Sequence, residues 1–225
     1  MEAFSLAGVR ISKIPLIQIT ATIIKKIELN KDLSGVACSR NTWAAVGKDA
    51  SIFVSTDNGN TWSLKNSGDP IVFYSAACNG NTWAAVGENG FVFISKDNGN
   101  TWEQNYGGNN KKFFSVACHK NMWMAVAATW EGLVYFSTDN GKEWNFNNTG
   151  TNVLLSGVAC HDNTCIVVGA NGTISVSTDN GNTWSVKNTG IDKLLSGIAA
   201  NGNTWVVAAE DGTILRIKDI AGWQP

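Results

Sequence analysis

The chain has 225 residues and a formal net charge of −1, from 17 basic and 18 acidic side chains. This balance provides no basic surface for duplex nucleic acid and no polybasic segment for a lipid surface, so we expect neither partner. Pro is scarce, and short Gly and Asn clusters separate the apolar runs, which predicts many short strands and almost no helix.

The N-terminal part of the chain precedes the repeating sequence, and we expect residues 1–21 to be an extension of a single domain that spans residues 22–225. The apolar stretch at residues 14–24 is too short to cross a bilayer, and it lacks the basic region and cleavage site of a secretory signal. The sequence therefore predicts no membrane span.

One sequence segment, Ser-x-Asp-x-Gly-x-x-Trp, occurs four times almost letter for letter, and a fifth, diverged copy ends at Trp223. The successive tryptophans are 40, 42, 40 and 39 residues apart. Self-similarity at such a period indicates a repeat architecture. We therefore predict one module copied five times, at about residues 34–73, 74–113, 114–154, 155–195 and 196–225.

The second copy shows the strands expected in one module. Short apolar runs at residues 74–78, 82–87, 91–95 and 101–105 are separated by turn residues, including the Asn98-Gly99 pair that favours a reversal. Four antiparallel strands in about 40 residues make one β-propeller blade. The predicted fold is all-β, a five-bladed β-propeller of four-stranded antiparallel blades.

The last copy ends without room for a fourth strand. Aligning Ser34 with Ser196 places residues 23–29 opposite residues 185–191, which form the fourth strand of the preceding copy. We expect residues 23–29 to join the C-terminal blade, because this would close the ring and remove two exposed sheet edges. A closed ring of this kind is expected to be a monomer.

The cysteines follow the repeat. Cys38, Cys78, Cys118 and Cys160 occupy one position of the module, where the fifth copy has Ala200, so the position favours a small buried residue. We interpret the thiols as reduced, which weakly favours a cytoplasmic location. The sequence leaves open whether Cys160 and Cys165, across one hairpin, form a disulfide.

The repeated segment resembles the Asp box, also called the bacterial neuraminidase repeat, and the resemblance covers most of residues 23–223. In that family the motif lies in the turn between the third and fourth strands, away from the usual active site. The residue types indicate a structural role, because Asp accepts backbone N–H bonds, Gly adopts positive φ and Trp packs between blades. The residues in these roles are Asp57, Gly59, Trp62, Asp97, Gly99, Trp102, Asp139, Gly141, Trp144, Asp179, Gly181 and Trp184.

The sequence does not favour an enzyme or a metal protein. The resemblance to sialidases implies an arginine triad, but Arg10, Arg40 and Arg216 are placed where they would not converge. His119 and His161 are interpreted as polar turn residues on neighbouring blades, and we do not expect them to converge with the cysteines on a metal. One carboxylate per turn is too few for calcium. We predict no catalytic residues, no metal and no cofactor.

The face opposite the Asp boxes varies between copies. The third copy has two extra residues in its second-to-third-strand turn, including Trp130, the one Trp outside the repeat pattern. An exposed Trp in a loop insertion is a candidate binding residue, and the alternative is that it folds back onto Tyr106 or a neighbouring blade. The predicted binding residues are Trp130, Glu131, Tyr106, Lys111, Lys112 and Glu88.

These patterns favour a non-enzymatic binding or scaffold propeller that presents its variable face to a protein partner. In this role the chain resembles the photosystem assembly factor family of Asp-box propellers. The alternative is a multivalent lectin with glycan sites between blades, and a sialidase-like glycosidase is less favoured. A lectin would repeat its contact residues, whereas this face does not repeat.

Overall fold

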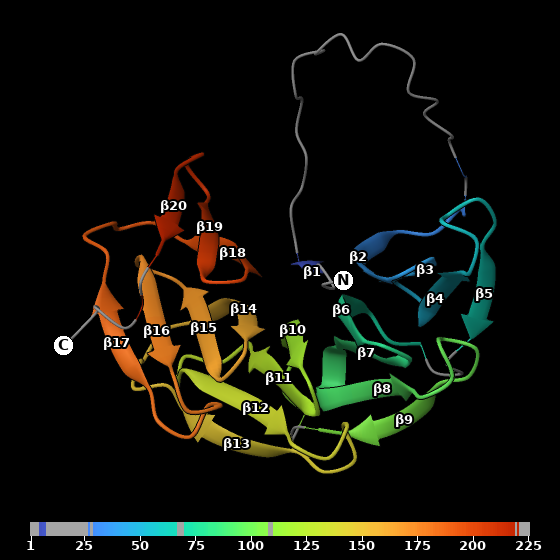
Figure 1. Ribbon diagram of the computed structural model, residues 1–225, viewed down its shortest axis with the longest axis horizontal. Coiled ribbons are helices and arrows are strands. Elements are labelled where there is room, and N and C mark those ends of the chain that lie inside the picture. The colour runs from blue at the N-terminus through green and yellow to red at the C-terminus, as the bar shows by residue number, and fades with distance from the viewer. Residues whose placement is uncertain are drawn as a thin grey trace, which may run out of the picture.

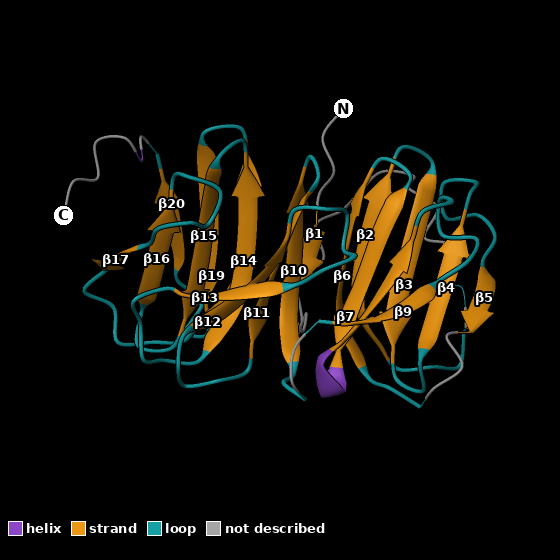
Figure 2. Ribbon diagram, turned by 90° about the horizontal axis from the view of Figure 1, so that it is seen from below, coloured by secondary structure: helices purple, strands orange, loops and turns teal. Residues whose placement is uncertain are grey.

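The computed structural model describes residues 5–7, 27, 29–66, 70–107, 110–218 and 220 of the chain. Its strands form five antiparallel sheets that follow one another along an arc around a common axis (Figures 1 and 2). The sheets occur in chain order, and each is built from consecutive strands. This arrangement matches the predicted series of five blades.

Blades one to four each carry the four predicted strands, numbered from the axis outward. The first contains β2 (Leu33–Ser39), β3 (Thr42–Gly47), β4 (Ser51–Ser55) and β5 (Ser63–Asn66). The second contains β6 (Phe73–Asn79), β7 (Thr82–Gly87), β8 (Phe91–Ser95) and β9 (Glu103–Tyr106), with a 3-10 turn at Glu88–Gly90. The third contains β10 (Phe113–His119), β11 (Met122–Ala127), β12 (Leu133–Ser137) and β13 (Asn145–Asn148). The fourth contains β14 (Leu155–His161), β15 (Thr164–Gly169), β16 (Thr173–Ser177) and β17 (Ser185–Asn188).

The fifth blade has three strands in the described part of the chain: β18 (Leu195–Asn201), β19 (Thr204–Ala209) and β20 (Ile214–Ile217). The predicted fourth strand, residues 23–29, lies almost entirely outside the described residues. Residues 27 and 29 are described and belong to no strand. The diverged fifth motif, which ends at Trp223, also lies outside them.

The register of the strands repeats from blade to blade. Cys38 is opposite Trp43, Cys78 is opposite Trp83, and the third blade has the same pairing between Cys118 and Trp123. The fourth strand of the second blade begins at Glu103, two residues later than predicted. The reason is local, because Thr101 and Trp102 still belong to the repeated turn and bond back into it.

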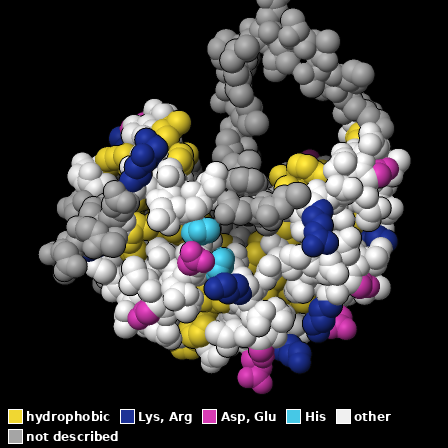
Figure 3. Space-filling view, viewed as in Figure 1, with side chains coloured by type: hydrophobic (Ala, Val, Ile, Leu, Met, Phe, Trp, Pro, Cys, Tyr) yellow, Lys and Arg dark blue, Asp and Glu magenta, His cyan; other side chains and the backbone are white. Residues whose placement is uncertain are grey.

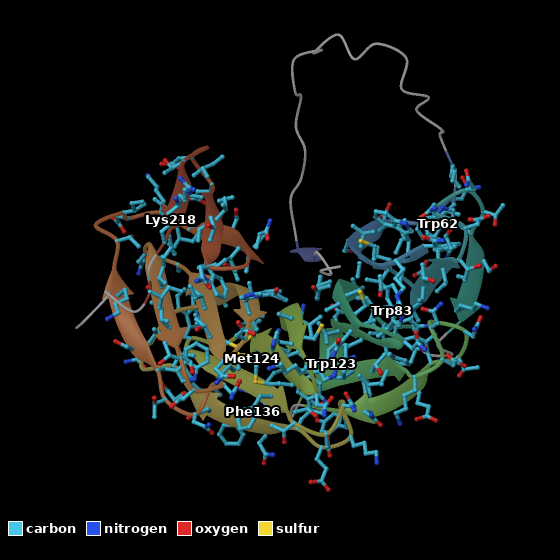
Figure 4. The ribbon with its side chains drawn as sticks, viewed as in Figure 1. Trp62, Trp83, Trp123, Met124, Phe136 and Lys218 are labelled. Carbon is cyan, nitrogen blue, oxygen red and sulfur yellow. A yellow bond between two sulfur atoms is a disulfide. The ribbon has the colours of Figure 1, made fainter. Side chains whose placement is uncertain are left out.

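The core lies between neighbouring blades. Trp83, Trp123 and Trp205 are fully or almost fully buried on the second strands, and Figure 4 shows the first two on adjacent sheets. The blades approach so closely that a Cβ atom on Gly141 would lie 2.7 Å from Cδ1 of Ile94 in the preceding blade. Glycine at this position therefore satisfies both a positive φ of 82° and close packing.

One short strand was not expected. β1 (Ser5–Ala7) pairs antiparallel with the inner edge of β2, so the first sheet has five strands. β1 also contacts β6, β10 and β18, which places it inside the arc of sheets (Figure 1). Three residues carry no periodic signal, so this non-local pairing could not be inferred from the sequence. No helix in the described residues is long and apolar enough to cross a membrane.

Candidate functional site

The repeated turns between third and fourth strands are held by their own side chains. In the second blade, the Ser95 hydroxyl donates to Asp97, and Asp97 Oδ1 accepts the backbone N–H of Thr101 at 2.8 Å. The Thr101 hydroxyl donates to the other carboxylate oxygen at 2.6 Å, and the Trp102 indole donates to the Gly99 carbonyl at 3.0 Å. These bonds occupy the polar groups within the turn itself.

Such bonds lower the pKa of the turn carboxylates. Hydrogen bonds from the side chain and backbone of Thr61 are the main cause that brings the pKa of Asp57 down to about 2. For Asp139 the first cause of the lowered pKa is the backbone N–H of Glu143. The carboxylates are therefore ionised at neutral pH and serve as acceptors inside the turns.

Two faces of the arc can be distinguished by their turns. The repeated turns bond to the first-to-second-strand turns of the same blade, for example through Asn98 N and Asn81 O at 2.9 Å. We call this the turn face. The second-to-third-strand turns lie at the other ends of the strands, together with the connections between blades, and we call that side the loop face.

Trp130 projects from the loop face. It lies in the turn between β11 and β12, and 69% of its surface is exposed. The adjacent backbone is fixed, because Asn148 donates its side-chain amide to the Glu131 carbonyl at 2.9 Å and Thr149 N donates to Gly132 O at 3.0 Å. The structure thus shows an exposed Trp on a braced loop, in place of the alternative in which Trp130 folds back.

Lys112 links this loop to the preceding blade. Its carbonyl accepts the Ala128 N–H at 2.7 Å, and its ammonium lies 3.3 Å from the carboxylate of Glu88. The Tyr74 hydroxyl also donates to Glu88, at 3.1 Å. Lys111 is next to this group in the chain and is partly buried. Glu88, Lys112 and the Trp130 loop therefore form one connected stretch of the loop face.

Aromatic side chains extend this stretch toward the outer strands. Tyr106 is 53% exposed, and its hydroxyl oxygen accepts the backbone N–H of Asn110 at 2.8 Å. Burial is the main cause that raises the pKa of Tyr135, and Glu131 and Tyr106 add to the effect. Phe146, directly opposite Tyr135 on β13, is 61% exposed. We call Tyr106, Trp130 and Phe146 the aromatic patch.

Sequence reasoning did not include Phe146. Its position in the module carries Leu64 in the first copy, Gln104 in the second and Val186 in the fourth, so the residue looked like an ordinary member of a fourth strand. An aromatic residue on an outer edge strand was the available signal. Its side chain adds exposed apolar area on the strand whose Asn148 bonds to the Trp130 loop.

The two histidines lie close to one another, at the ends of β10 and β14. Their ring centroids are 5.8 Å apart near the middle of the turn face, where they appear side by side in Figure 3. Asp162 lies 3.6 Å from Nε2 of each ring. The histidines approach because they end the innermost strands of adjacent blades near the axis, so they are strand-end residues and not the turn residues that were predicted. The described residues nevertheless contain no group of three His, Cys, Asp or Glu side chains arranged to hold a metal ion.

Cys160 and Cys165 form a disulfide between register partners on β14 and β15. The interpretation of all thiols as reduced is therefore wrong for this pair. Cys38, Cys78 and Cys118 are free, and the Cys78 thiol donates to the Cys38 carbonyl while Cys118 donates to that of Cys78. Burial raises the pKa of Cys78 to about 12, which keeps this thiol protonated and unreactive.

Comparison with solved structures places the chain among β-propellers. YCF48 from Cyanidioschyzon merolae superposes with a TM-score of 0.66 at 15% identity, over 86% of this chain and 69% of that protein. YCF48 bound to a D1 peptide gives 0.50 at 14% identity, over 83% and 76%. An ancestral GH74 enzyme gives 0.58 at 16% identity, over 83% of this chain but 31% of the enzyme.

These identities are low, so the similarity concerns the fold. No protein-family model and no curated protein sequence matches the chain. The β-propeller architecture is shared with a protein that binds a peptide and with an enzyme.

Proposed function

We propose that this chain is a non-enzymatic binding propeller whose loop face docks a protein partner around the aromatic patch. The observation that carries the proposal is the exposure of Trp130 on a loop whose backbone is fixed by Asn148 and Thr149. An aromatic side chain on a fixed backbone loses less conformational freedom on binding than one on a mobile loop, and Trp and Tyr are enriched among residues that dominate binding energy.

The charges beside the patch suit a protein interface. Lys112 and Glu88 are already paired, so a partner can cover them without leaving an unpaired charge. Glu131 and Lys111 lie at the margin of the same stretch and are proposed as polar contacts. A YCF48 propeller of similar fold binds a D1 peptide, which supports a peptide or protein ligand for such a scaffold.

Replacement of Trp130 by Ala tests the proposal. The melting temperature should change little, because an exposed loop side chain contributes little to the core, while the affinity for a protein partner should fall by about tenfold or more. Partners are captured from a native lysate on the immobilised wild-type chain and identified, and their affinities for both variants are then measured.

The matched control is Asn171→Ala, in the corresponding turn of the fourth blade. A single protein site predicts almost no loss of binding for this variant, whereas a lectin with equivalent sites in several blades predicts a loss similar to that of Trp130→Ala. Unchanged affinity of Trp130→Ala for every captured protein would refute the proposed surface.

We further propose that the scaffold is a closed ring in which residues 23–29 form the fourth strand of the fifth blade. Support comes from two apolar positions that are exposed in the fifth blade and buried in each of the other four. Val206 is 42% and Ile214 is 69% exposed. Their counterparts in the other four blades are fully buried: Ala44, Ala84, Met124 and Ile166 for Val206, and Ile52, Val92, Val134 and Ile174 for Ile214.

The facing side of the first blade shows the same difference. Leu33 is 42% exposed, whereas its counterparts are fully buried: Phe73, Phe113, Leu155 and Leu195. The fifth and first blades therefore each leave one apolar side uncovered. Every other pair of neighbouring blades buries the corresponding sides against each other. Covering both sides would remove this apolar area from water.

A further inference from the structure

Two cavities lie between neighbouring blades at equivalent places on the turn face. The larger, about 560 Å³, separates the β2–β3 turn from the β6–β7 turn and is lined by Ser39, Arg40, Asn41, Thr42, Gly80, Asn81 and Asn98. The smaller, about 230 Å³, separates the β14–β15 turn from the β18–β19 turn and is lined by His161, Asp162, Thr164, Gly202, Asn203, Trp205 and Ile220. The larger volume lies within the range of small-molecule sites.

A glycine lies at the tip of one turn beside each cavity. Gly80 and Gly202 occupy the same position of the module, and a Cβ atom on either would meet nothing within 4 Å. Between the second and third blades the tip residue is Lys120, whose carbonyl accepts a bond from Asn79. Between the third and fourth blades it is Asp162, which lies 3.6 Å from His119. At these two seams the turns are bridged, by the Asn79 side chain in one and by the Asp162 carboxylate beside His119 in the other.

The backbone does not require glycine at this position. The φ angles at the tip are 54° for Arg40, 61° for Gly80, 53° for Lys120, 49° for Asp162 and 55° for Gly202. Three of the five copies thus hold an ordinary side chain in the same conformation. The space beside Gly80 is consequently a feature of the sequence at this seam and not a consequence of turn geometry.

The larger cavity presents one cation and several neutral hydrogen-bonding groups. No hydrogen bond or ion pair joins the Arg40 guanidinium to the described residues. The buried Thr42 hydroxyl accepts the side-chain amide of Asn98 at 2.8 Å across the two blades, which fixes both groups in the wall. Asn41 and Asn81 add exposed amides, each able to donate and accept.

We propose that this cavity binds a sugar acid, a small ring with several hydroxyl groups and one carboxylate. The Arg40 guanidinium pairs with the carboxylate in a charge-assisted bond. The ring hydroxyls exchange hydrogen bonds with Asn41, Asn81 and Ser39. The site goes beyond the proposed protein-binding function, because it lies on the turn face, opposite the aromatic patch. It is a single site, since the smaller cavity has Asp162 where the larger has Arg40.

The experiment is a titration of the full chain followed by nuclear magnetic resonance, with three probes. Sodium glucuronate should bind with a Kd of about 1 mM, as expected for a ligand of this size. Glucose, which lacks the carboxylate, should bind at least tenfold more weakly. Methyl glucuronide distinguishes two sources of the ligand. A site for the terminal residue of a glycan should bind it as well as glucuronate, whereas a site for the free acid should bind it more weakly.

Two variants and two controls locate the site. Arg40→Gln should weaken glucuronate at least tenfold and leave glucose unchanged, and Gly80→Asn should fill the cavity and abolish binding. Gly202→Asn, with the same backbone conformation at the other cavity, should bind as wild type does, and so should Trp130→Ala. The proposal is overturned if glucuronate at about 10 mM causes no shifts, if Arg40→Gln binds it normally, or if Gly202→Asn weakens it as much as Gly80→Asn.

Discussion

Protonation of His119 is disfavoured in the folded chain. Burial is the main cause that lowers the pKa of this imidazole, Lys120 and His161 lower it further, and Asp162 acts in the opposite direction. Its Nε2 is buried without a hydrogen-bond partner in the described residues. The folded pKa is thus below the unfolded value, so His119 contributes stability above about pH 6.5 that is lost as the pH falls.

We therefore expect His119→Asn to reduce the acid sensitivity of the fold. Asn is a suitable replacement because the second blade carries Asn79 at this position. The decrease in melting temperature between about pH 7.5 and pH 5 should be smaller in His119→Asn than in the wild type. Asp162→Asn should make the decrease in melting temperature larger, because this variant removes the carboxylate that favours the charged His119 ring. An identical decrease in His119→Asn would show that this residue does not determine the acid response.

At the scale of single elements, the repeated turn combines two kinds of stabilisation. Asp97 is exposed and contributes hydrogen bonds, whereas Trp102 is partly buried against a core cluster that contains residues of the first and second blades. Loss of a capping acceptor costs about 0.5 to 2 kcal/mol, and loss of a partly buried indole should cost more, about 2 to 4 kcal/mol.

Urea unfolding should rank the two variants accordingly, with Trp102→Ala less stable than Asp97→Ala. Asp139→Ala serves as a comparison, because Asp139 accepts backbone bonds from Lys142 and Glu143 but no Thr hydroxyl. It should be milder than Asp97→Ala. Equal midpoints for Asp97→Ala and Trp102→Ala, or a midpoint that depends on calcium, would contradict the interpretation of the turn.

The elements that the sequence predicts well are those governed by local chemistry. Alternating apolar runs and Asn-Gly turns define the strands of each blade, and the predicted segments 82–87 and 91–95 coincide with β7 and β8. The features that sequence analysis missed are contacts between distant segments. The pairing of β1 with β2 and the approach of His119 to His161 depend on how the N-terminal segment and neighbouring blades are placed around the axis.

At the scale of the whole molecule, repetition makes each pair of neighbouring blades a control for the others. Positions that are buried at four seams and exposed at the fifth show where the described residues leave the ring incomplete. The same comparison separates the candidate sites from the scaffold. The Trp130 loop and the cavity beside Gly80 are departures from the module, whereas the turn carboxylates recur and serve the fold.

Ring closure by residues 23–29 can be tested by deleting residues 1–30. If these residues cover the fifth blade, their removal exposes the edge of β20 together with Val206 and Ile214, and we expect dimers or aggregates in size-exclusion chromatography with light scattering. A deletion variant that stays soluble and monomeric, with the wild-type melting temperature, would exclude closure by this segment.

Ile214→Lys tests the same closure in the full-length chain, which avoids dependence on a truncated protein. In a closed ring Ile214 is buried, so the charge should lower the melting temperature by about 10 °C, as should Ile174→Lys at the equivalent position of the fourth blade. Leu64→Lys, on an exposed outer strand, should leave it nearly unchanged. If Ile214→Lys behaves like Leu64→Lys, the fifth blade keeps its apolar side open to water, and the surface between the first and fifth blades is free for another molecule.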